Sequence, residues 1–177
     1  MEEKDIRRKR QSEVSKDGKE KEKEVIDILY SDKEIRERFD IGIPSKVLKD
    51  IASIEIPYGS YKTKIDADIC VVSKKDNRLV CVISVKKSLR ERGAQTAYWA
   101  LKIREAKKRF KYIFCTPDVN KELFDPENPN KKRKWRIILP HECDSVFVYS
   151  YEGKVFKEKN FYVGKKYLIE YIKHIKL

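Results

Sequence analysis

Apolar and polar residues follow a helical spacing near the start of the chain. From Gly18 the sequence GKEKEKEVIDILYSDKEIRERF predicts a helix with Val25 and Leu29 on its buried side. The stretch before it, 1–17, alternates charges and has almost no apolar residues. Such a composition predicts a charged, mobile arm, so we expect one domain over 18–177 preceded by this arm.

The next apolar runs have the spacing of strands. Ile54–Tyr58 is short, and 64–72 alternates before it becomes wholly apolar. A turn at 75–78 leads into 79–86, which returns beside it as the second arm of a hairpin. A strand that is apolar on both faces is typical of the middle of a sheet covered by helices on both sides.

The second half of the chain continues with mixed elements. The pattern predicts a helix over 88–110, strands over 112–115, 135–139 and 145–149, and an amphipathic helix over 164–177. Ser88 is the predicted N-cap of the first of these helices, with Glu91 completing a capping box. The order predicts an α/β fold, a mixed β-sheet flanked by helices with an α-β-β-β-α-β core.

Composition narrows the possible partners. The chain has 177 residues and a formal net charge of +13, which favours a polyanion such as nucleic acid. It contains no apolar run long enough to cross a bilayer and no secretory signal, so we expect a cytoplasmic protein with no membrane partner. The four cysteines form no CxxC pair and predict reduced, buried thiols.

Candidate chemistry gathers where the two arms of the hairpin meet. Asp66 and Asp68 share a face of the first strand, and Ser84 and Lys86 share a face of the second. A carboxylate beside an ammonium at a strand end suits metal-assisted cleavage of phosphodiesters, because the carboxylate holds a hard cation and the lysine positions water. Taken alone, such residues are more often a solvated strand end.

The motifs on these strands resemble a known family. An Asp followed one hairpin later by X-x-Lys is the pattern of the PD-(D/E)XK nuclease superfamily. The stretch 61–105 resembles type II restriction endonucleases that carry Ser-x-Lys, here Ser84-Val85-Lys86, followed by SLRERGAQ (88–95). The resemblance implies a restriction-endonuclease-like core.

The resemblance also implies roles for individual residues. Asp68 would bind Mg²⁺, Lys86 would be the catalytic lysine, Ser84 would stand where other members have an acid, and Val85 would offer its carbonyl to the metal. The residues expected to contact DNA are Lys87, Ser88, Arg90, Glu91, Arg92 and Gln95. Two cations of a later loop, Lys132 and Arg133, are expected either to contact phosphates or to be solvated.

One acidic residue of the expected metal site is missing. Members with Ser-x-Lys recover it about four turns along the following helix, but that register falls on Trp99 or Ala100 here. Four glutamates could replace it, and they are Glu24, Glu55, Glu91 and Glu105. We favour Glu24, because many superfamily members place a glutamate on the first helix.

These features predict a Mg²⁺-dependent type II restriction endonuclease that cuts double-stranded DNA at a short, palindromic site and leaves 5′-phosphates. A homodimer would match such a site, and a cognate DNA methyltransferase is expected as the genetic partner. The alternatives are a structure-selective repair or junction-resolving nuclease of the same fold, and a DNA-binding module without catalysis.

Overall fold

The fold is described from a computed structural model, which describes residues 2–90, 92–151, 153 and 155–176. Six α-helices are assigned, and they are α1 (Glu2–Tyr30), α2 (Lys33–Arg38), α3 (Pro44–Val47), α4 (Arg92–Glu105), α5 (Lys134–Glu142) and α6 (Lys165–Lys173). A 3-10 helix, η1, covers Ile51–Ile54. The strands are β1 (Phe39–Gly42), β2 (Glu55–Tyr58), β3 (Tyr61–Lys64), β4 (Ile69–Ser73), β5 (Leu79–Val85), β6 (Lys111–Thr116), β7 (Ser145–Val148), β8 (Phe156–Glu158) and β9 (Phe161–Val163).

Seven strands form one mixed sheet in the order β1-β4-β5-β6-β7-β9-β8. The strands β1, β4 and β5 are antiparallel neighbours, whereas β5, β6, β7 and β9 run parallel to one another. The strands β2 and β3 form a separate hairpin. The predicted fold class, a mixed sheet flanked by helices, is confirmed.

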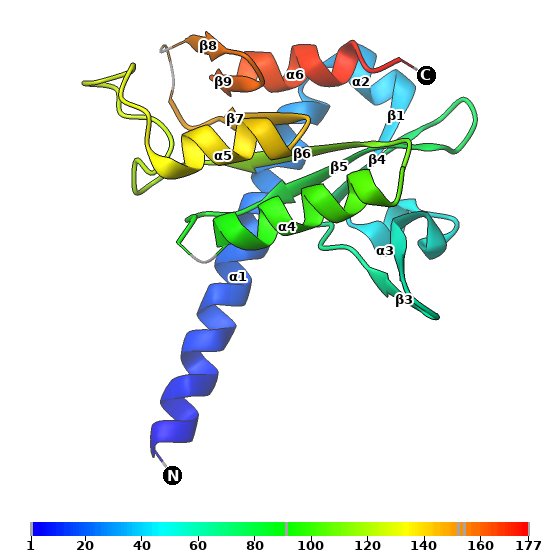
Figure 1. Ribbon diagram of the computed structural model, residues 1–177, viewed down its shortest axis with the longest axis horizontal. Coiled ribbons are helices and arrows are strands. Elements are labelled where there is room, and N and C mark those ends of the chain that lie inside the picture. The colour runs from blue at the N-terminus through cyan, green and yellow to red at the C-terminus, as the bar shows by residue number, and fades with distance from the viewer. Residues whose placement is uncertain (1, 91, 152, 154, 177) are drawn as a thin grey trace.

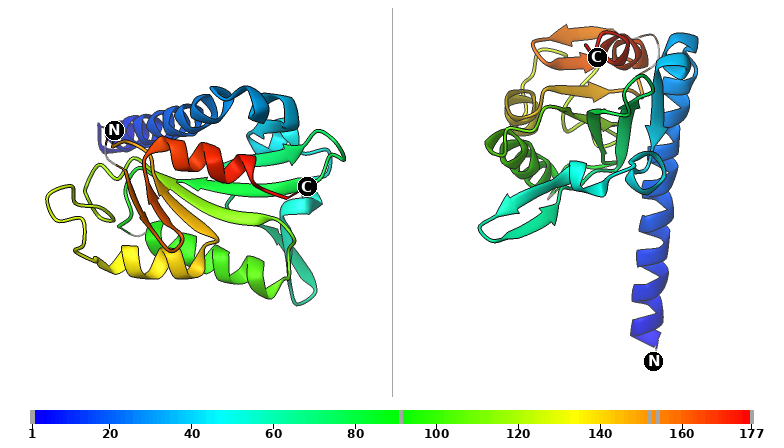
Figure 2. Two further views of the ribbon diagram at one scale, coloured as in Figure 1. Left: turned by 90° about the horizontal axis from the view of Figure 1, so that it is seen from above. Right: turned by 90° about the vertical axis from the view of Figure 1, so that its right-hand side faces the viewer.

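Helices cover both faces of this sheet (Figures 1 and 2). On one face, α4 and α5 bury Ala100, Ile103 and Leu139 against the sheet. On the other, α1 and α6 bury Val25 and Leu168. All seven residues of β5 are buried, as expected for a strand that is apolar on both faces.

The first helix is longer than the pattern predicts. It begins at Glu2 rather than at Gly18 and crosses the boundary expected at residue 17 without a break. Its N-terminal part projects well beyond the body of the molecule (Figure 1). The division into an arm and a domain therefore stays a prediction, while the helix start at Gly18 is wrong.

One predicted strand is a helix. The run 135–139 belongs to α5, because its buried residues Arg136 and Leu139 are three positions apart, which is the spacing of one helical face. Ile137 between them is 58% exposed, so the run of apolar letters is not a buried strand. The four cysteines are free and buried, as predicted.

The helices can be compared with the length and apolar character that a bilayer span requires. Within the residues that the structure describes, none of them combines the length and the apolar character needed to cross a bilayer.

Candidate active site

The start of β4 and the end of β5 bring the predicted catalytic residues together. These strands are antiparallel, and Ile69 pairs with Ile83, so the residue before β4 lies beside the residues that end β5. Asp68 comes directly before β4 and Lys86 directly after β5. Asp66 and Asp68 lie in an irregular segment rather than on the predicted strand. The pairing of β4 with β5 nevertheless places Asp68 beside Lys86.

Asp68 is the centre of this cluster. Its carboxylate accepts hydrogen bonds from the Lys86 ammonium, with Nζ 2.9 Å from Oδ2 and 3.2 Å from Oδ1. It also accepts the Val85 N–H at 2.7 Å and lies 3.4 Å from the buried Ser84 hydroxyl, which donates to it. Both charged side chains are largely buried, since Asp68 is 14% and Lys86 12% exposed. The pair is therefore held rigidly at the edge of the core.

A second carboxylate shares the same lysine. Asp66 Oδ2 lies 3.1 Å from Lys86 Nζ. Burial lowers the pKa of Lys86, but attraction and hydrogen bonds from Asp68 and Asp66 outweigh burial, so its pKa is raised. Lys86 is consequently a protonated ammonium at neutral pH and can donate hydrogen bonds.

A third carboxylate, that of Glu22 on α1, feels the charges of this cluster. Burial raises the pKa of Glu22, the Asp68 carboxylate raises it further, and Lys86 lowers it, so all three side chains share one electrostatic environment. Sequence reasoning missed Glu22, although a signal exists. It lies three residues before Val25 and seven before Leu29, on the same helical stripe as these two buried residues.

Glu24, which the sequence favoured, contacts other partners. Its carboxylate lies 2.8 Å from Lys21 Nζ and accepts a 3.4 Å hydrogen bond from the Tyr149 hydroxyl. Glu55 lies on β2, and Glu105, at the end of α4, pairs with Lys102. Glu91 lies outside the described residues. Between Glu22 and Glu24, it is Glu22 whose pKa responds to Asp68 and Lys86, whereas Glu24 contacts Lys21 and Tyr149.

The donor set suits a hard divalent cation. Asp66, Asp68 and Glu22 oppose one ammonium, so three negative charges against one positive leave a formal charge of −2. Carboxylate oxygens are ligands that Mg²⁺ prefers. The N–H of Val85 points to Asp68, and its C=O faces the same side of the strand, which places a carbonyl oxygen there as well.

No ready-made metal cage exists among the residues that the structure describes, since no three histidine, cysteine or acidic side chains are grouped closely enough to hold an ion. In their place, the Lys86 ammonium bridges Asp66 and Asp68. A cation at Asp68 would require this ammonium to shift toward incoming phosphate or water.

The segment after Lys86 carries most of the predicted DNA contacts. Lys87 and Arg90 are exposed, and Lys87 forms a 2.6 Å ion pair with Asp17 of α1. Arg92 donates a 3.0 Å hydrogen bond to the Gln95 side chain at the start of α4. Ser88 lies partly buried between them. These cations and Gln95 lie on the same edge of the sheet as Lys86.

The two cations of the later loop have acidic partners. Lys132 lies 3.5 Å from Glu158, and Arg133 lies 3.8 Å from Asp125. Both pairs are at the long end of the range for ion pairs, and the two cations are 57% and 39% exposed, whereas Asp125 is only 15% exposed. The exposed cations can therefore also meet a phosphate.

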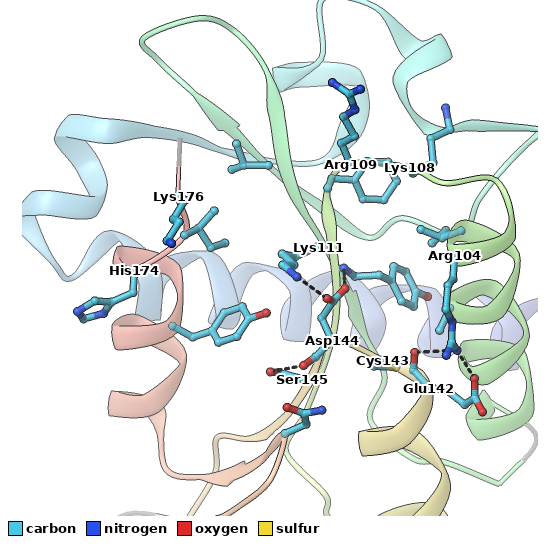
Figure 3. Close-up of a pocket in the computed structure, with 18 of the residues that line it drawn as sticks. Arg104, Lys108, Arg109, Lys111, Glu142, Cys143, Asp144, Ser145, His174 and Lys176 are labelled. Carbon is cyan, nitrogen blue, oxygen red and sulfur yellow. Dashed lines mark hydrogen bonds and ion pairs between the residues drawn. The ribbon is translucent and has the colours of Figure 1, made fainter.

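A large cavity lies away from this cluster, at the opposite ends of the strands (Figure 3). It measures about 1070 Å³ and borders the starts of β5, β6 and β7. Two of the cations that line it form ion pairs within the fold, since Lys111 lies 2.8 Å from Asp144 and Arg104 is paired with Glu142. Cations also complement the carboxyl ends of α4, α5 and α6, which adjoin this cavity.

Comparison with known proteins shows which family the chain belongs to. The model of a family described as BsaWI restriction endonuclease type 2 matches residues 44–170, a span that includes Asp68 and Lys86. The chain belongs to the BsaWI restriction endonuclease family. Glu22, on α1, lies before the matched span.

Two relatives of this BsaWI-family chain are named as candidate type II restriction enzymes. MjaVIP of Methanocaldococcus jannaschii is 36% identical over 123 residues, which is 67% of this chain and 53% of the relative. HpyAORF263P of Helicobacter pylori is 29% identical over 76 residues, 42% of this chain and 39% of the relative. The chain therefore spans about half or less of these relatives.

The fold agrees with a solved member of the BsaWI family. A crystal structure of the pre-specific BsaWI–DNA complex superposes with a TM-score of 0.57 at 14% sequence identity. The match covers 97% of this chain and 64% of that one. At this identity the likeness shows a shared fold, in agreement with the mixed sheet described above.

Proposed function

We propose that this chain is a Mg²⁺-dependent, sequence-specific type II restriction endonuclease. It would hydrolyse both strands of double-stranded DNA at a short palindromic site and leave 5′-phosphate and 3′-hydroxyl ends. The observation that carries the proposal is the buried Asp68–Lys86 pair, which lies within the span matched by the family model. The net charge of +13 supports a polyanionic substrate.

The metal would be held by Asp68, the Val85 carbonyl and Glu22. When bound there, Mg²⁺ would supply positive charge that offsets the negative charge developing on the scissile phosphate. Asp66, which pairs with Lys86, adds a further negative charge beside this site. Ser84, whose hydroxyl donates to Asp68, would orient that carboxylate rather than bind metal.

Lys86 would act on the attacking water. Its ammonium, which lies 2.9 Å from Asp68, would turn from that carboxylate toward the reacting groups when the cation binds, and there it would hold a water oxygen in line with phosphorus. The water oxygen would form a bond to phosphorus and give up a proton to solvent, while the bond from phosphorus to the 3′-oxygen breaks and the 3′-oxygen takes a proton from solvent. The segment from Lys87 to Gln95, together with Lys132 and Arg133, would contact DNA.

The assembly follows from the substrate. Two copies related by a two-fold axis would match a palindromic site and bring one centre to each strand. We propose a cytoplasmic homodimer encoded beside a DNA methyltransferase that protects the same site in host DNA.

Digestion of unmethylated genomic DNA tests the proposed function. With Mg²⁺, the wild-type chain should yield discrete bands whose ends share one sequence and carry 5′-phosphates. The Asp68→Asn variant, which removes one carboxylate charge from the centre, should leave the DNA intact. A continuous smear, intact DNA with the wild-type chain, or cutting of four-way junctions alone would contradict site-specific cleavage.

A further inference from the structure

The described residues between β5 and α4, 86–90, lie outside the helices and strands. β5 ends at Val85 and α4 begins at Arg92. Leu89 C=O accepts the N–H of Gly93 at 2.6 Å, so the helical hydrogen bonds begin at Leu89. The N–H groups at the start of a helix have no partner within it and must be satisfied from elsewhere.

The partner comes from a distant loop. Glu122 accepts the N–H of Leu89 at 2.7 Å through Oε2 and that of Arg90 at 3.2 Å through Oε1. One carboxylate thus caps the beginning of the helix across 32 and 33 residues of sequence. Such charge-assisted bonds to backbone N–H groups are stronger than neutral ones.

Glu122 is itself fixed in place. Asp118 is 2% exposed, and its carboxylate accepts the N–H groups of Glu122 at 2.7 Å, of Leu123 at 3.1 Å and of Phe124 at 2.8 Å. Leu123 and Phe124 are buried in the core under the sheet. The loop is therefore an extension of the core rather than a free surface loop.

The loop and the catalytic strand depend on the same strand. The loop follows β6 directly, and the C=O of Cys115 in β6 accepts the N–H of Lys86 at 3.2 Å. β6 thus fixes Lys86 from one side and, through Asp118 and Glu122, fixes Leu89 and Arg90 from the other.

A second contact restrains the same helical turn. A Cβ atom at Gly93 would lie 2.5 Å from Trp135 Cδ2, so the indole ring packs directly on the glycine backbone. The start of α4 is therefore held between Glu122 and Trp135. These restraints act on the turn that carries the predicted DNA contacts.

We infer that Glu122 is a positioning residue for DNA cleavage. It holds the segment from Lys87 to Gln95 at a fixed distance from Lys86. The residues that contact phosphates and the catalytic lysine then act on the same nucleotide. The inference rests on the proposed function. The negative charge of Glu122 lies beside the exposed Arg90 and weakens the field that attracts DNA. A carboxylate that opposes DNA binding in this way favours a positioning role.

Because this charge opposes DNA binding, loss of the Glu122 charge and loss of its cap are expected to have opposite effects on the interaction with DNA. Glu127 lies in the same loop and is exposed, so Glu127→Ala removes the same charge without removing the cap. If Glu122 contributed only its charge, Glu122→Ala and Glu127→Ala would both bind duplex DNA more tightly at low salt. If Glu122 positions the segment, Glu122→Ala should lose cleavage while Glu127→Ala should not.

The readout is the single-turnover cleavage rate at saturating DNA, on a duplex carrying a cut position mapped for the wild-type chain. Glu122→Ala should lower this rate about 10- to 100-fold, the order expected when reacting groups are displaced by a fraction of an ångström to 1 Å. Glu127→Ala should stay within about twofold. Glu122→Gln, which keeps the shape and one acceptor oxygen, should fall between them.

Amide hydrogen exchange separates positioning from general stability. In Glu122→Gln, exchange should accelerate at Leu89 and Arg90 while the amides of β5 and β6 keep their protection. This measurement remains decisive if Glu122→Ala does not fold. Unchanged exchange at both amides, or equal rates for Glu122→Ala and Glu127→Ala, would overturn the inference, whereas absence of cutting by the wild-type chain would overturn the proposed function itself.

Discussion

The Lys86→Ala variant is expected to lose DNA cleavage while it still binds DNA. The Lys86 ammonium is the cation that contacts both Asp66 and Asp68, and it carries the positive charge beside these carboxylates. The single-turnover cleavage rate should fall by about 10³-fold, as for removal of a positioned catalytic donor. Duplex affinity in Mg²⁺ should change by less than about tenfold, because one charge of many is removed.

Lys75→Ala is the matched control for this variant. Lys75 lies in the turn at the far end of the same hairpin and is exposed. The Lys75→Ala substitution removes an equal charge from the same pair of strands without changing the cluster of Asp66, Asp68 and Lys86. The cleavage rate of this variant should therefore match that of the wild-type chain. Cleavage by Lys86→Ala at the control's rate would remove Lys86 from the mechanism.

A comparison of Glu22→Gln with Glu24→Gln should identify the acid that completes the metal site. Glu22 shares its environment with Asp68 and Lys86, whereas Glu24 contacts Lys21 and Tyr149. We expect Glu22→Gln to raise the Mg²⁺ concentration needed for half-maximal cleavage, or lower the rate, by about 10²-fold, the order found when groups around a metal are altered. Glu24→Gln should behave like the wild-type chain.

These two substitutions are chemically identical and lie two residues apart on one helix. A general effect of lost charge or helix stability would therefore appear in both. A defect confined to Glu24→Gln would show that the first helix presents its other face to the metal and would contradict our assignment of Glu22.

The sequence predicted the centre because its residues lie at the ends of one hairpin. The wholly apolar run of β5 identified a central strand, and a short turn fixed how its end meets Asp68. Local sequence therefore determined which residues come together, even though Asp66 and Asp68 lie just outside β4.

The sequence could not predict contacts that join distant segments. Glu22 shares a helical stripe with the buried Val25 and Leu29, but this stripe alone does not say which part of the sheet Glu22 meets. Glu122 meets Leu89 across 33 residues, so no local pattern pairs them. The misread helix α5 has the same origin, because the burial of Arg136 depends on Glu158 and the surrounding aromatic rings.

The central claim is that Asp68 and Glu22 hold a divalent cation beside Lys86. The most direct test is a crystal structure with duplex DNA and Mn²⁺, in which anomalous scattering locates the metal. We predict a peak bound by Asp68, the Val85 carbonyl and Glu22, with the Lys86 ammonium turned toward the scissile phosphate. A peak that lacks Asp68, or one bound by Glu24 in place of Glu22, would contradict this account.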